Sequence, residues 1–565
     1  MTITQKHWQI PPRITPEADA ELHGYPQILR QILFNRGYST HEQARNFLEA
    51  SSGFDTDPFN LPDMRAAVER ILYAIHHGQK IAIYGDYDVD GVTATALLVQ
   101  VLNSLHVDVI GYIPHRFNEG YGINTAALDQ LKEQGVDLVI TVDCGIRSLE
   151  EALHAQALGL DLIISDHHTP GDELPAALAV IDPKRSDSQY PEINLAGVGV
   201  AYKLASAIAS QIDFPVNAPI GDYLDFVALG TVADLVPLVG ENRTLVRAGL
   251  KLMRHPRRQG LLSLMGVSGI QPEKITATDI GFGLGPRLNA AGRLDTALDA
   301  LTLLTTQDLL KAGEIAQQLE IQNRKRQSIT RDIQAQAEAL ALAEDPEALL
   351  LFAAHPDFNA GVVGLAASRL TEQYYRPAVV GQIDDEYTRA SCRSITEFHI
   401  TEALDQCADL LEKYGGHAAA AGFTVHNRNL PELIERLKSL AKEELSGQDL
   451  HPTLHADAEL PLSALKPELL EYLDWLQPTG YGNPQAAFVS RGLKVTQSRT
   501  VGSDQSHLKL TVTDGQLTFD AIAFRLGEWH SHMPPRIDIL YRFEINEFRG
   551  KKTLQLNVKD IRSTQ

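Results

Sequence analysis

The sequence predicts a multidomain α/β protein that starts with a parallel-sheet domain and ends in a β-barrel. Between residues 64 and about 235, short apolar runs alternate with helical patterns, which is typical of a doubly wound parallel sheet. From about residue 452, five strand-like segments are separated by turn residues, which favours an OB-like barrel. The chain has 565 residues, too many for one hydrophobic core, so three or more domains are expected.

Changes in pattern divide the chain into five expected parts. They are an N-terminal extension packed on the first domain (1–63), the first α/β domain (64–235), a helical region (236–345), a second α/β domain (346–445) and the barrel (452–565). The helical region contains a long helical pattern at 306–342, which we expect to hold two domains apart across a cleft. Its basic run Asn323–Arg326 is typical of a solvent-facing helix surface, and contact with DNA phosphates is the alternative.

Composition excludes several classes of protein. The hydrophobic content of 44% is that of a globular protein, and no apolar run approaches the roughly 20 residues that span a bilayer. The first residues lack the pattern of a secretory signal, and the three cysteines lack CxxC spacing, so we expect a cytoplasmic protein without disulfides or a zinc ribbon. The net charge of −22 argues against a broadly basic nucleic-acid-binding surface but allows a local basic groove.

Three aspartates follow the first apolar run of the α/β domain. In the stretch KIAIYGDYDVDG, a buried strand is expected at Ile81–Tyr84, and Asp86, Asp88 and Asp90 come after it. Alternate side chains of an extended segment share a face, so the three carboxylates can point to one place. Carboxylates that lie so close together raise each other's pKa unless a cation neutralises them. An acidic turn that merely caps the next helix is the alternative.

Two later apolar runs also end in polar side chains. The run DLVITVDCG ends in Asp143, and the run LDLIISDHH ends in Asp166, His167 and His168. In open α/β sheets, ligands bind at the carboxyl ends of the strands. Aspartate and histidine ligands without cysteine suit Mn²⁺ or Mg²⁺ better than structural zinc. The sequence therefore predicts a divalent metal centre at this edge.

These stretches resemble the motifs of a known superfamily. YGDYDVDG, VDCG, SDHH and GTVADLVPL (230–238) resemble the four signature motifs of the DHH phosphoesterases. IPHRFNEGYG (113–122), GPRLNAAGRL (285–294) and GGHAAAAG (415–422) are similar to the RecJ branch, bacterial 5′→3′ exonucleases specific for single-stranded DNA. The resemblance runs from about Ile81 to the C-terminus. It implies a DHH domain, a DHH-associated (DHHA1) domain and an OB-fold nucleic-acid-binding domain as the three sheet-containing parts.

The resemblance also implies site residues. Two ions, Mn²⁺ or Mg²⁺, would be bound by Asp86, Asp88, Asp90, Asp143, His167 and Asp234. Asp143 would bridge them, with Asp90, His167 and Asp234 on one ion and Asp88, near Asp86, on the other. The sorting of the first three aspartates between the ions stays open. His168 would act in catalysis by facing the substrate phosphate, and Asp166 could orient the ring of His167.

A second implied set would bind the DNA strand. Arg116, Ser391 and Arg393 match positions that hold a 5′-phosphate, and Arg287, Asn289 and Arg293 match a motif that grips the strand. His417 lies in a Gly- and Ala-rich stretch expected to be an anion-binding turn. An ordinary surface salt bridge is the alternative for each arginine. In the barrel, cations interleave with Phe519, Phe524, Tyr541 and Phe543, which suits a single-strand groove, although any barrel has half-buried aromatics.

The implied function is a single-strand-specific 5′→3′ exodeoxyribonuclease that releases 5′-mononucleotides in DNA repair and recombination. Its expected partners are single-stranded DNA, a single-stranded-DNA-binding protein and a repair helicase, with the enzyme as a monomer. The alternatives are an oligoribonuclease or phosphoesterase acting on short nucleotides, and a non-catalytic single-strand-binding scaffold. The barrel favours a polymeric substrate, and the presence of all six metal positions favours catalysis. The sequence contains no GxxxxGK[ST] motif, so an ATPase is not supported.

Overall fold

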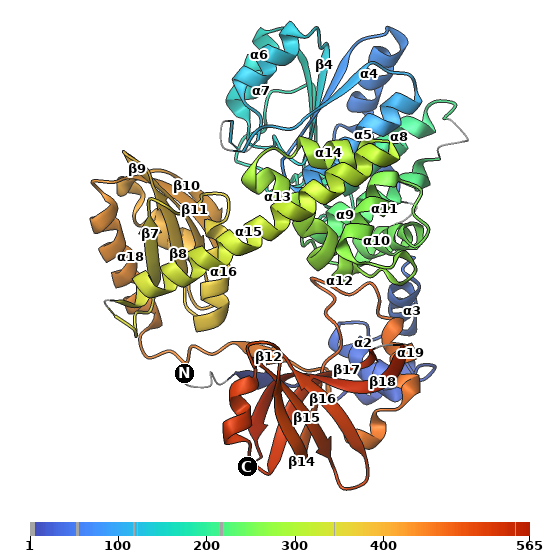
Figure 1. The fold of residues 1–565 in the computed structure, drawn as a ribbon. Coiled ribbons are helices and arrows are strands. Elements are labelled where there is room, and N and C mark those ends of the chain that lie inside the picture. The colour runs from blue at the N-terminus through green and yellow to red at the C-terminus, as the bar shows by residue number, and fades with distance from the viewer. Residues whose placement is uncertain are drawn as a thin grey trace.

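The computed structural model describes residues 6–51, 56–116, 119–120, 122–214, 219–343, 345–548 and 550–564. Three sheet-containing bodies are arranged around the long helix α15 (Leu309–Ala343) and the chain segments that connect them (Figure 1). The first body lies at the top of the view, the second at the left and the barrel at the bottom. Over the described ranges, no helix is long and apolar enough to cross a membrane.

The first body is built on a five-stranded parallel sheet of order β3-β2-β4-β5-β6. Its strands are β2 (Ile81–Gly85), β3 (Val109–Tyr112), β4 (Leu138–Val142), β5 (Asp161–Ser165) and β6 (Ala179–Ile181). Its helices are α4 (Met64–His76), α5 (Val89–Ser104), α6 (Thr125–Glu133), α7 (Leu149–Ala157), α8 (Gly197–Ser210) and α9 (Leu224–Ala233).

Alternate residues of these strands enter two hydrophobic cores on opposite faces of the sheet. Ile81 and Ile83 of β2 lie in the core that contains α4, α5 and α8. Ala82 and Tyr84 lie in the core that contains α6 and α7. Because helices cover both faces, the strands are apolar throughout, as a parallel sheet requires. The predicted doubly wound sheet is confirmed.

The helical region packs beneath this sheet domain and leads into α15. It contains α10 (Gly240–Met253), α11 (Gln259–Ser268), α12 (Ala277–Asp279), the π-helical segment η4 (Ile280–Leu284), α13 (Gly285–Leu294) and α14 (Leu298–Thr305). At about 1.5 Å per residue, the 35 residues of α15 span roughly 50 Å. Ala316 and Leu319 near its start pack in the core of the first body, and Ile333 and Ala337 pack in the second body. The predicted connector helix is confirmed.

The second body is a five-stranded sheet of order β10-β11-β9-β8-β7. Its elements are β7 (Leu351–His355), α16 (Val363–Tyr374), β8 (Ala378–Ile383), β9 (Tyr387–Arg393), α17 (Ile400–Asp405), β10 (Leu411–His417), β11 (Ala420–His426) and α18 (Leu430–Leu445). Gly415, Gly416 and His417 are the last residues of β10, so they do not begin a turn as the sequence suggested. Gly416 has a φ of +151°, and a Cβ there would lie 2.4 Å from the carbonyl oxygen of Ala420 on the partner strand.

The last body is a barrel closed by the pairing of β14 with β17. Its strands are β13 (Ala458–Glu459), β14 (Phe488–Val501), β15 (His507–Thr513), β16 (Thr518–Ala523), β17 (Arg536–Phe548) and β18 (Lys551–Ser563), and α19 (Pro467–Asp474) precedes β14. Five of these strands close the ring in the order β14-β15-β16-β18-β17. The predicted five-stranded barrel is confirmed.

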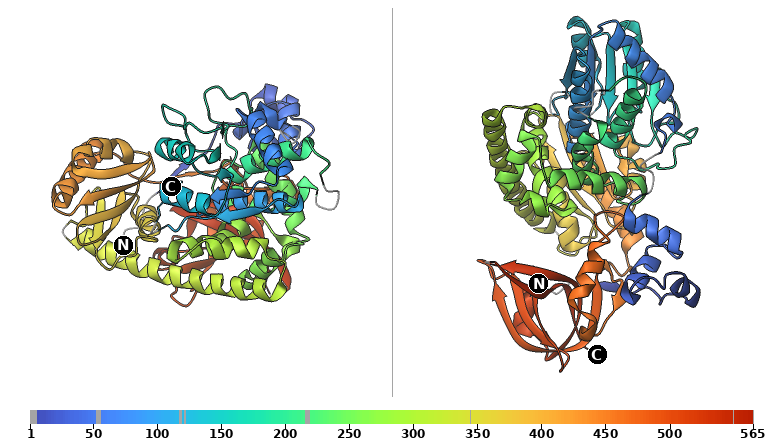
Figure 2. Two further views of the ribbon diagram at one scale, coloured as in Figure 1. Left: turned by 90° about the horizontal axis from the view of Figure 1, so that it is seen from above. Right: turned by 90° about the vertical axis from the view of Figure 1, so that its right-hand side faces the viewer.

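The expected docking of the N-terminal extension on the first domain is wrong for most of its length. Strand β1 (His7–Gln9) pairs in parallel with β12 (Thr453–His455). Helices α2 (Gln27–Asn35) and α3 (His41–Glu49) share a hydrophobic core with the barrel, and Figure 2 shows the N-terminal helices beside it. An amphipathic pattern shows that a helix buries one face but not which partner it meets. Within this extension, Leu61 does pack in the core of the first body.

Candidate metal centre

The carboxyl ends of three neighbouring parallel strands bring the predicted ligands together. Asp86, Asp88 and Asp90 follow β2, Asp143 follows β4, Asp166–His168 follow β5, and Asp234 is the C-terminal cap of α9. Three sets of potential ligand atoms each lie within 4.8 Å of one another: Asp90 with His167 and Asp234, Asp86 with Asp88 and Asp143, and Asp143 with both histidines. The structure thus groups all six predicted metal ligands.

Asp143 lies between two sets of potential metal ligands. Its Oδ1 is 3.0 Å from Nε2 of His167, which in turn lies 3.6 Å from Oδ2 of Asp234 and 3.7 Å from Oδ2 of Asp90. Asp143 also belongs to the set formed with Asp86 and Asp88. One carboxylate can therefore contribute to both sets, which is the arrangement that a pair of ions requires.

The local backbone explains how these side chains converge. Asp88 is the N-cap of α5, and its Oδ1 accepts hydrogen bonds from the backbone N–H of Asp90 at 2.8 Å and Gly91 at 3.2 Å. Asp90, in the first turn of α5, accepts backbone N–H groups of Gly197 (2.7 Å) and Val198 (2.8 Å) at the start of α8. The capping alternative is thus correct for Asp88 and compatible with a metal site.

Asp143 has a left-handed backbone conformation with a φ of +62°. A non-glycine residue in this region costs roughly 1–2 kcal/mol and is often found at functional sites. Gly197 packs against it, and a Cβ at Gly197 would lie 2.7 Å from the Cβ of Asp143. The fold therefore accepts backbone strain in order to place this carboxylate beside α8.

Burial and mutual repulsion raise the pKa of the carboxyl groups. Burial and Asp88 raise the pKa of Asp90 to about 7, and burial together with Asp90 and Asp88 raises the pKa of Asp234 to about 9. Burial and the neighbouring His168 lower the pKa of His167 to about 3, so its ring is neutral. Nε2 of His167 and Oδ1 of Asp86 are buried, and neither has a hydrogen-bond partner among the described residues.

This donor set fits divalent cations. Buried acceptors without donors are costly, and a cation beside them removes both that cost and the repulsion between the carboxylates. A neutral imidazole is the form that binds metal. Oxygen and imidazole donors without a thiolate suit Mn²⁺ or Mg²⁺.

Asp166 orients His168, and the expectation that it orients His167 is wrong. Its Oδ1 lies 2.7 Å from Nδ1 of His168, while its Oδ2 accepts the backbone N–H of Ile146 at 2.9 Å. Burial lowers the pKa of His168, but the hydrogen bond from its ring to Asp166 and the charge of Asp166 outweigh it and raise the pKa to about 9. His168 is therefore an imidazolium whose side chain is 41% exposed, next to Asp143.

The predicted phosphate-binding residues come from two separate parts of the chain, strand β9 and the segment after β3. Ser391 and Arg393 lie two residues apart in β9, so they share a face of the sheet. Gly364 of α16 packs against both, and a Cβ at Gly364 would lie 3.3–3.4 Å from them. The guanidinium of Arg116 lies 4.7 Å from the ring centre of Tyr87. In the sequence, Tyr87 stands between the first two aspartates of the metal centre.

Arg293 of α13 connects these groups. Burial lowers its pKa to about 10, and the charges of Arg116, Arg326 and Arg393 contribute. Its Nη1 donates a hydrogen bond to the carbonyl oxygen of Gly361 at 3.2 Å, just before α16. Cations of the first body, of α15 and of the second body therefore lie within electrostatic range of one another.

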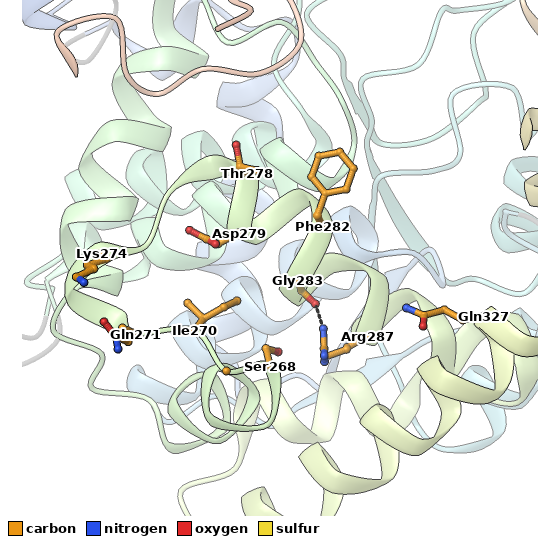
Figure 3. A pocket seen from close by; sticks show the side chains of 11 residues that line it. Ser268, Ile270, Gln271, Lys274, Thr278, Asp279, Phe282, Gly283, Arg287 and Gln327 are labelled. Carbon is orange, nitrogen blue, oxygen red and sulfur yellow. Dashed lines mark hydrogen bonds between the residues drawn. The ribbon is translucent and has the colours of Figure 1, made fainter. Parts of the chain in front are cut away.

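Arg287 and His417 lie apart from this cluster. At about 100° per residue, Arg287 points roughly 120° away from Arg293 around α13, whereas Asn289 shares the face of Arg293. Arg287 pairs with Glu320 at 2.7 Å and lines a cavity of about 590 Å³ with Phe282 and Gln327 (Figure 3). His417 is exposed and lies two strands from Arg393 in the sheet.

Two further arginines extend the cluster toward the barrel. The charge of Arg369 on α16 acts on Arg326 of α15, and the charge of Arg525 after β16 acts on Arg369. Among the described residues, none of Arg116, Arg293, Arg326, Arg369, Arg393 and Arg525 has a carboxylate within 4.0 Å, and we call these six the arginine row. Arg369 was missed from the sequence because it belongs to no motif and follows an ordinary helical pattern.

The barrel aromatics divide into buried and exposed rings. Tyr541 and Phe543 are buried in the barrel core, so the expectation that they stack on bases is wrong. Phe519 packs edge-on against Phe543 at 6.0 Å. Phe524 is 54% exposed and lies beside Arg525, which leaves it as the predicted ring that can meet a base. Arg549, a predicted barrel cation, lies outside the described residues.

Three family models match this chain. The DHH family N-terminal domain matches residues 80–231, the DHHA1 domain matches residues 347–443, and the RecJ OB domain matches residues 456–560. Each match falls on one of the three sheet-containing bodies. The domain types predicted from the motifs are therefore confirmed.

Relatives match nearly the whole chain. It is 38% identical over 544 residues to the single-stranded-DNA-specific exonuclease RecJ of Bacillus subtilis, covering 96% of this chain and 68% of that relative. The RecJ of Salmonella typhimurium is 36% identical over 574 residues, with 97% of each chain covered. The crystal structure of Thermus thermophilus RecJ in complex with Mn²⁺ superposes with a TM-score of 0.86 at 28% identity, covering 99% of this chain and 80% of that chain. The chain therefore belongs to the RecJ family of single-stranded-DNA-specific exonucleases.

Proposed function

We propose that this protein hydrolyses single-stranded DNA from its 5′ end and releases 5′-mononucleotides with the help of two divalent ions, Mn²⁺ or Mg²⁺. The observation that carries the proposal is the pair of ligand sets that meet at Asp143. Two such ions supply a water-derived nucleophile and neutralise charge on the attacking and leaving oxygens. Asp143 would be shared by both ions; Asp90, His167 and Asp234 would hold one of them, and Asp88 with Asp86 would hold the other.

His168 and Asp166 act on the scissile phosphate as a pair. The hydrogen bond to Asp166 keeps the His168 ring in one orientation, and the raised pKa of His168 keeps the ring charged at neutral pH. A charged donor beside the ligand set stabilises the extra negative charge that develops on the phosphate oxygens. This assigns His168 to catalysis rather than to metal binding.

The 5′ end is recognised by the arginine row where it approaches the metal centre. Arg116, Ser391 and Arg393 bind the terminal phosphate, and Arg293 completes its charge neutralisation. Guanidinium groups without carboxylate partners repel one another, and a phosphate between them turns that repulsion into attraction. Asn289, which shares the face of α13 with Arg293, contacts the DNA strand. His417 of β10 provides a further contact to the DNA.

The DNA strand runs from the metal centre along the rest of the arginine row toward the barrel. Arg326, Arg369 and Arg525 contact successive phosphates, and Phe524 stacks on a base. On a chain of net charge −22, these unpaired cations form a local attractive path. A path that ends on the barrel suits a polymer better than a dinucleotide, which disfavours the alternative of a short-nucleotide phosphoesterase.

Digestion of end-labelled oligonucleotides with Mn²⁺ or Mg²⁺ tests the proposal. We expect labelled mononucleotides from 5′-labelled single-stranded DNA, preference for a 5′-phosphate, and resistance of blunt duplexes. Parallel RNA oligonucleotides and dinucleotides test the alternative substrates. Equal attack on circular and linear single strands would contradict a mechanism that starts at an end, and binding without any hydrolysis would support a scaffold.

The cellular setting is part of the same proposal. The enzyme acts as a monomer in the cytoplasm, in DNA repair and recombination, on single strands presented by a repair helicase and a single-stranded-DNA-binding protein. Its catalytic unit comprises residues 64–235 and 346–445 joined by 236–345, with 452–565 as the strand-binding unit. Light scattering of the purified protein tests the monomer, and pull-downs with the two partner classes test the associations.

A further inference from the structure

Arg243 of α10 is buried at the junction of three parts of the chain. It is 1% exposed, and its five N–H groups donate to five backbone carbonyl oxygens. These belong to Phe47 (2.8 Å), Trp475 (3.1 Å), Leu476 (2.8 Å), Gln477 (2.8 Å) and Pro478 (3.1 Å). In the described part of the chain, no carboxylate lies within 4.0 Å of this guanidinium.

The geometry of these bonds fixes the loop after α19. A guanidinium is a rigid fork with five donors, so four consecutive carbonyl oxygens can meet it only if the loop Trp475–Pro478 adopts one conformation. Trp475 is the C-cap of α19, where the helix dipole favours a cation. The guanidinium also lies 4.1 Å from the ring of Phe47 in α3. One side chain thus joins the helical region to the N-terminal segment and to the barrel.

The residues that follow this loop contact the chain segment after Asp234. The backbone N–H of Leu238 donates to the carbonyl oxygen of Tyr481 at 2.8 Å. Gly482 packs against Pro237, and a Cβ at Gly482 would lie 2.8 Å from the Cβ of Pro237. The chain that continues from the loop fixed by Arg243 is therefore bonded to a segment that begins three residues after a candidate metal ligand.

We infer that Arg243 is a positioning residue that holds the barrel in register with the metal centre, so that a strand bound on the barrel is aligned for cleavage. This inference rests on the proposed function. The barrel is covalently connected to the catalytic bodies through the linker after α18 and through the N-terminal segment, so its orientation depends on non-covalent contacts. Arg243 supplies a buried and geometrically strict contact of this kind.

Kinetics on long and short substrates test the inference. For Arg243→Met we expect kcat/KM on a DNA strand of about 40 nucleotides to fall at least about tenfold, mainly through KM, because several buried carbonyl groups lose their donors. Hydrolysis of a trinucleotide, which is too short to reach the barrel, should change less than about threefold. Arg243→Lys keeps the charge and part of the hydrogen bonding, so its kcat/KM on the long DNA strand should lie between those of the wild type and Arg243→Met. Equal losses on both substrates, or none on either, would overturn the inference.

Arg247→Met is the matched control. Arg247 lies one turn later on α10 and donates to the carbonyl oxygen of Leu48 in the N-terminal segment, and over the described ranges no hydrogen bond joins it to the loop Trp475–Pro478. We expect this variant to keep wild-type kinetics on the long strand. A loss as large as that of Arg243→Met would overturn the specific role of the loop.

A distance measurement tests the positioning without relying on activity. The three native cysteines are buried, so cysteines introduced at exposed Glu150 and Gln516 can carry spin labels on the first body and the barrel. Arg243→Met and Arg243→Lys should broaden the label distance distribution, and Arg247→Met should not. Unchanged distributions in both Arg243 variants would overturn the inference. If the wild type cleaved no DNA, the proposed function would fail, while the distances would still test the clamp.

Discussion

Removal of divalent ions should make the stability of this protein depend strongly on pH. Asp90 is buried among other carboxylates, and its folded-state pKa is about 7 against an ordinary value of 3.8. Between these values, the unfolded chain has lost the Asp90 proton while the folded chain retains it. Without ions, stability is therefore greatest at low pH and falls as the pH rises from about 4 to about 7.

The size of this effect follows from the shift. A difference of about three pKa units corresponds to roughly 4 kcal/mol at 1.36 kcal/mol per unit. Asp234, with a pKa of about 9, carries the loss to higher pH, but its shift includes the repulsion from Asp90, so the two are not added. For a domain of 150–250 residues, 1 kcal/mol changes Tm by roughly 2–4 °C, so Tm of the first body should fall by about 10 °C.

Thermal unfolding of chelator-treated protein at several pH values between about 4 and 8 measures this fall. Saturating Mn²⁺ should abolish most of it, because the ions bind the ionised carboxylates. Asp90→Asn in the metal-free protein should flatten the profile, because this substitution removes the titrating group and keeps its size. A metal-free Tm that is constant or rises over this range would refute the reasoning, as would an equal fall in the presence of Mn²⁺.

Three further outcomes test the site. Asp143→Ala should lower cleavage at least about 10³-fold with the fold intact, since it removes the carboxylate shared by both ligand sets, and metal titration with circular dichroism checks this. Arg393→Ala should reduce the preference for a 5′-phosphate over a 5′-hydroxyl about tenfold without changing metal affinity, because a charged hydrogen bond is lost, and paired substrates measure it. Replacing Arg369 and Arg525 with Gln should lower the slope of log K against log salt for a long strand by about 1–2, measured by fluorescence anisotropy. An unchanged slope would remove both residues from the strand path.

The metal centre could be predicted because its residues follow a simple rule of parallel sheets. Strands β2, β4 and β5 are neighbours, so the residues that follow them meet at one edge whatever the rest of the chain does. The apolar runs locate the strands, and the first polar residue after each run locates the edge. The sorting of the aspartates was open because Asp88 is the N-cap of α5 and Asp90 lies in its first turn, where the alternation of an extended segment no longer holds.

Other features depend on tertiary contacts that no local pattern encodes. The sequence places Asp166 beside both histidines, and only the turn geometry shows that its carboxylate meets Nδ1 of His168. Side chains of a strand alternate between its two faces, and Tyr541 lies on the face of β17 that enters the barrel core with Ile539 and Phe543. The N-terminal segment packs on residues more than 400 positions away, a contact that amphipathicity cannot specify.

In the proposed mechanism, the arginine row lets an acidic protein attract a polyanion at one place. Some arginines elsewhere in the molecule are paired with carboxylates, as Arg258 is with Asp225 and Arg436 is with Asp409 and Glu432. Such pairs cancel their own fields within a few ångströms, so they contribute little to attraction at a distance. The unpaired arginines keep their field and come from three bodies that the fold holds together. If these arginines bind the DNA as proposed, affinity for a phosphate backbone depends on the relative placement of these bodies, and the contacts between the bodies contribute to substrate binding.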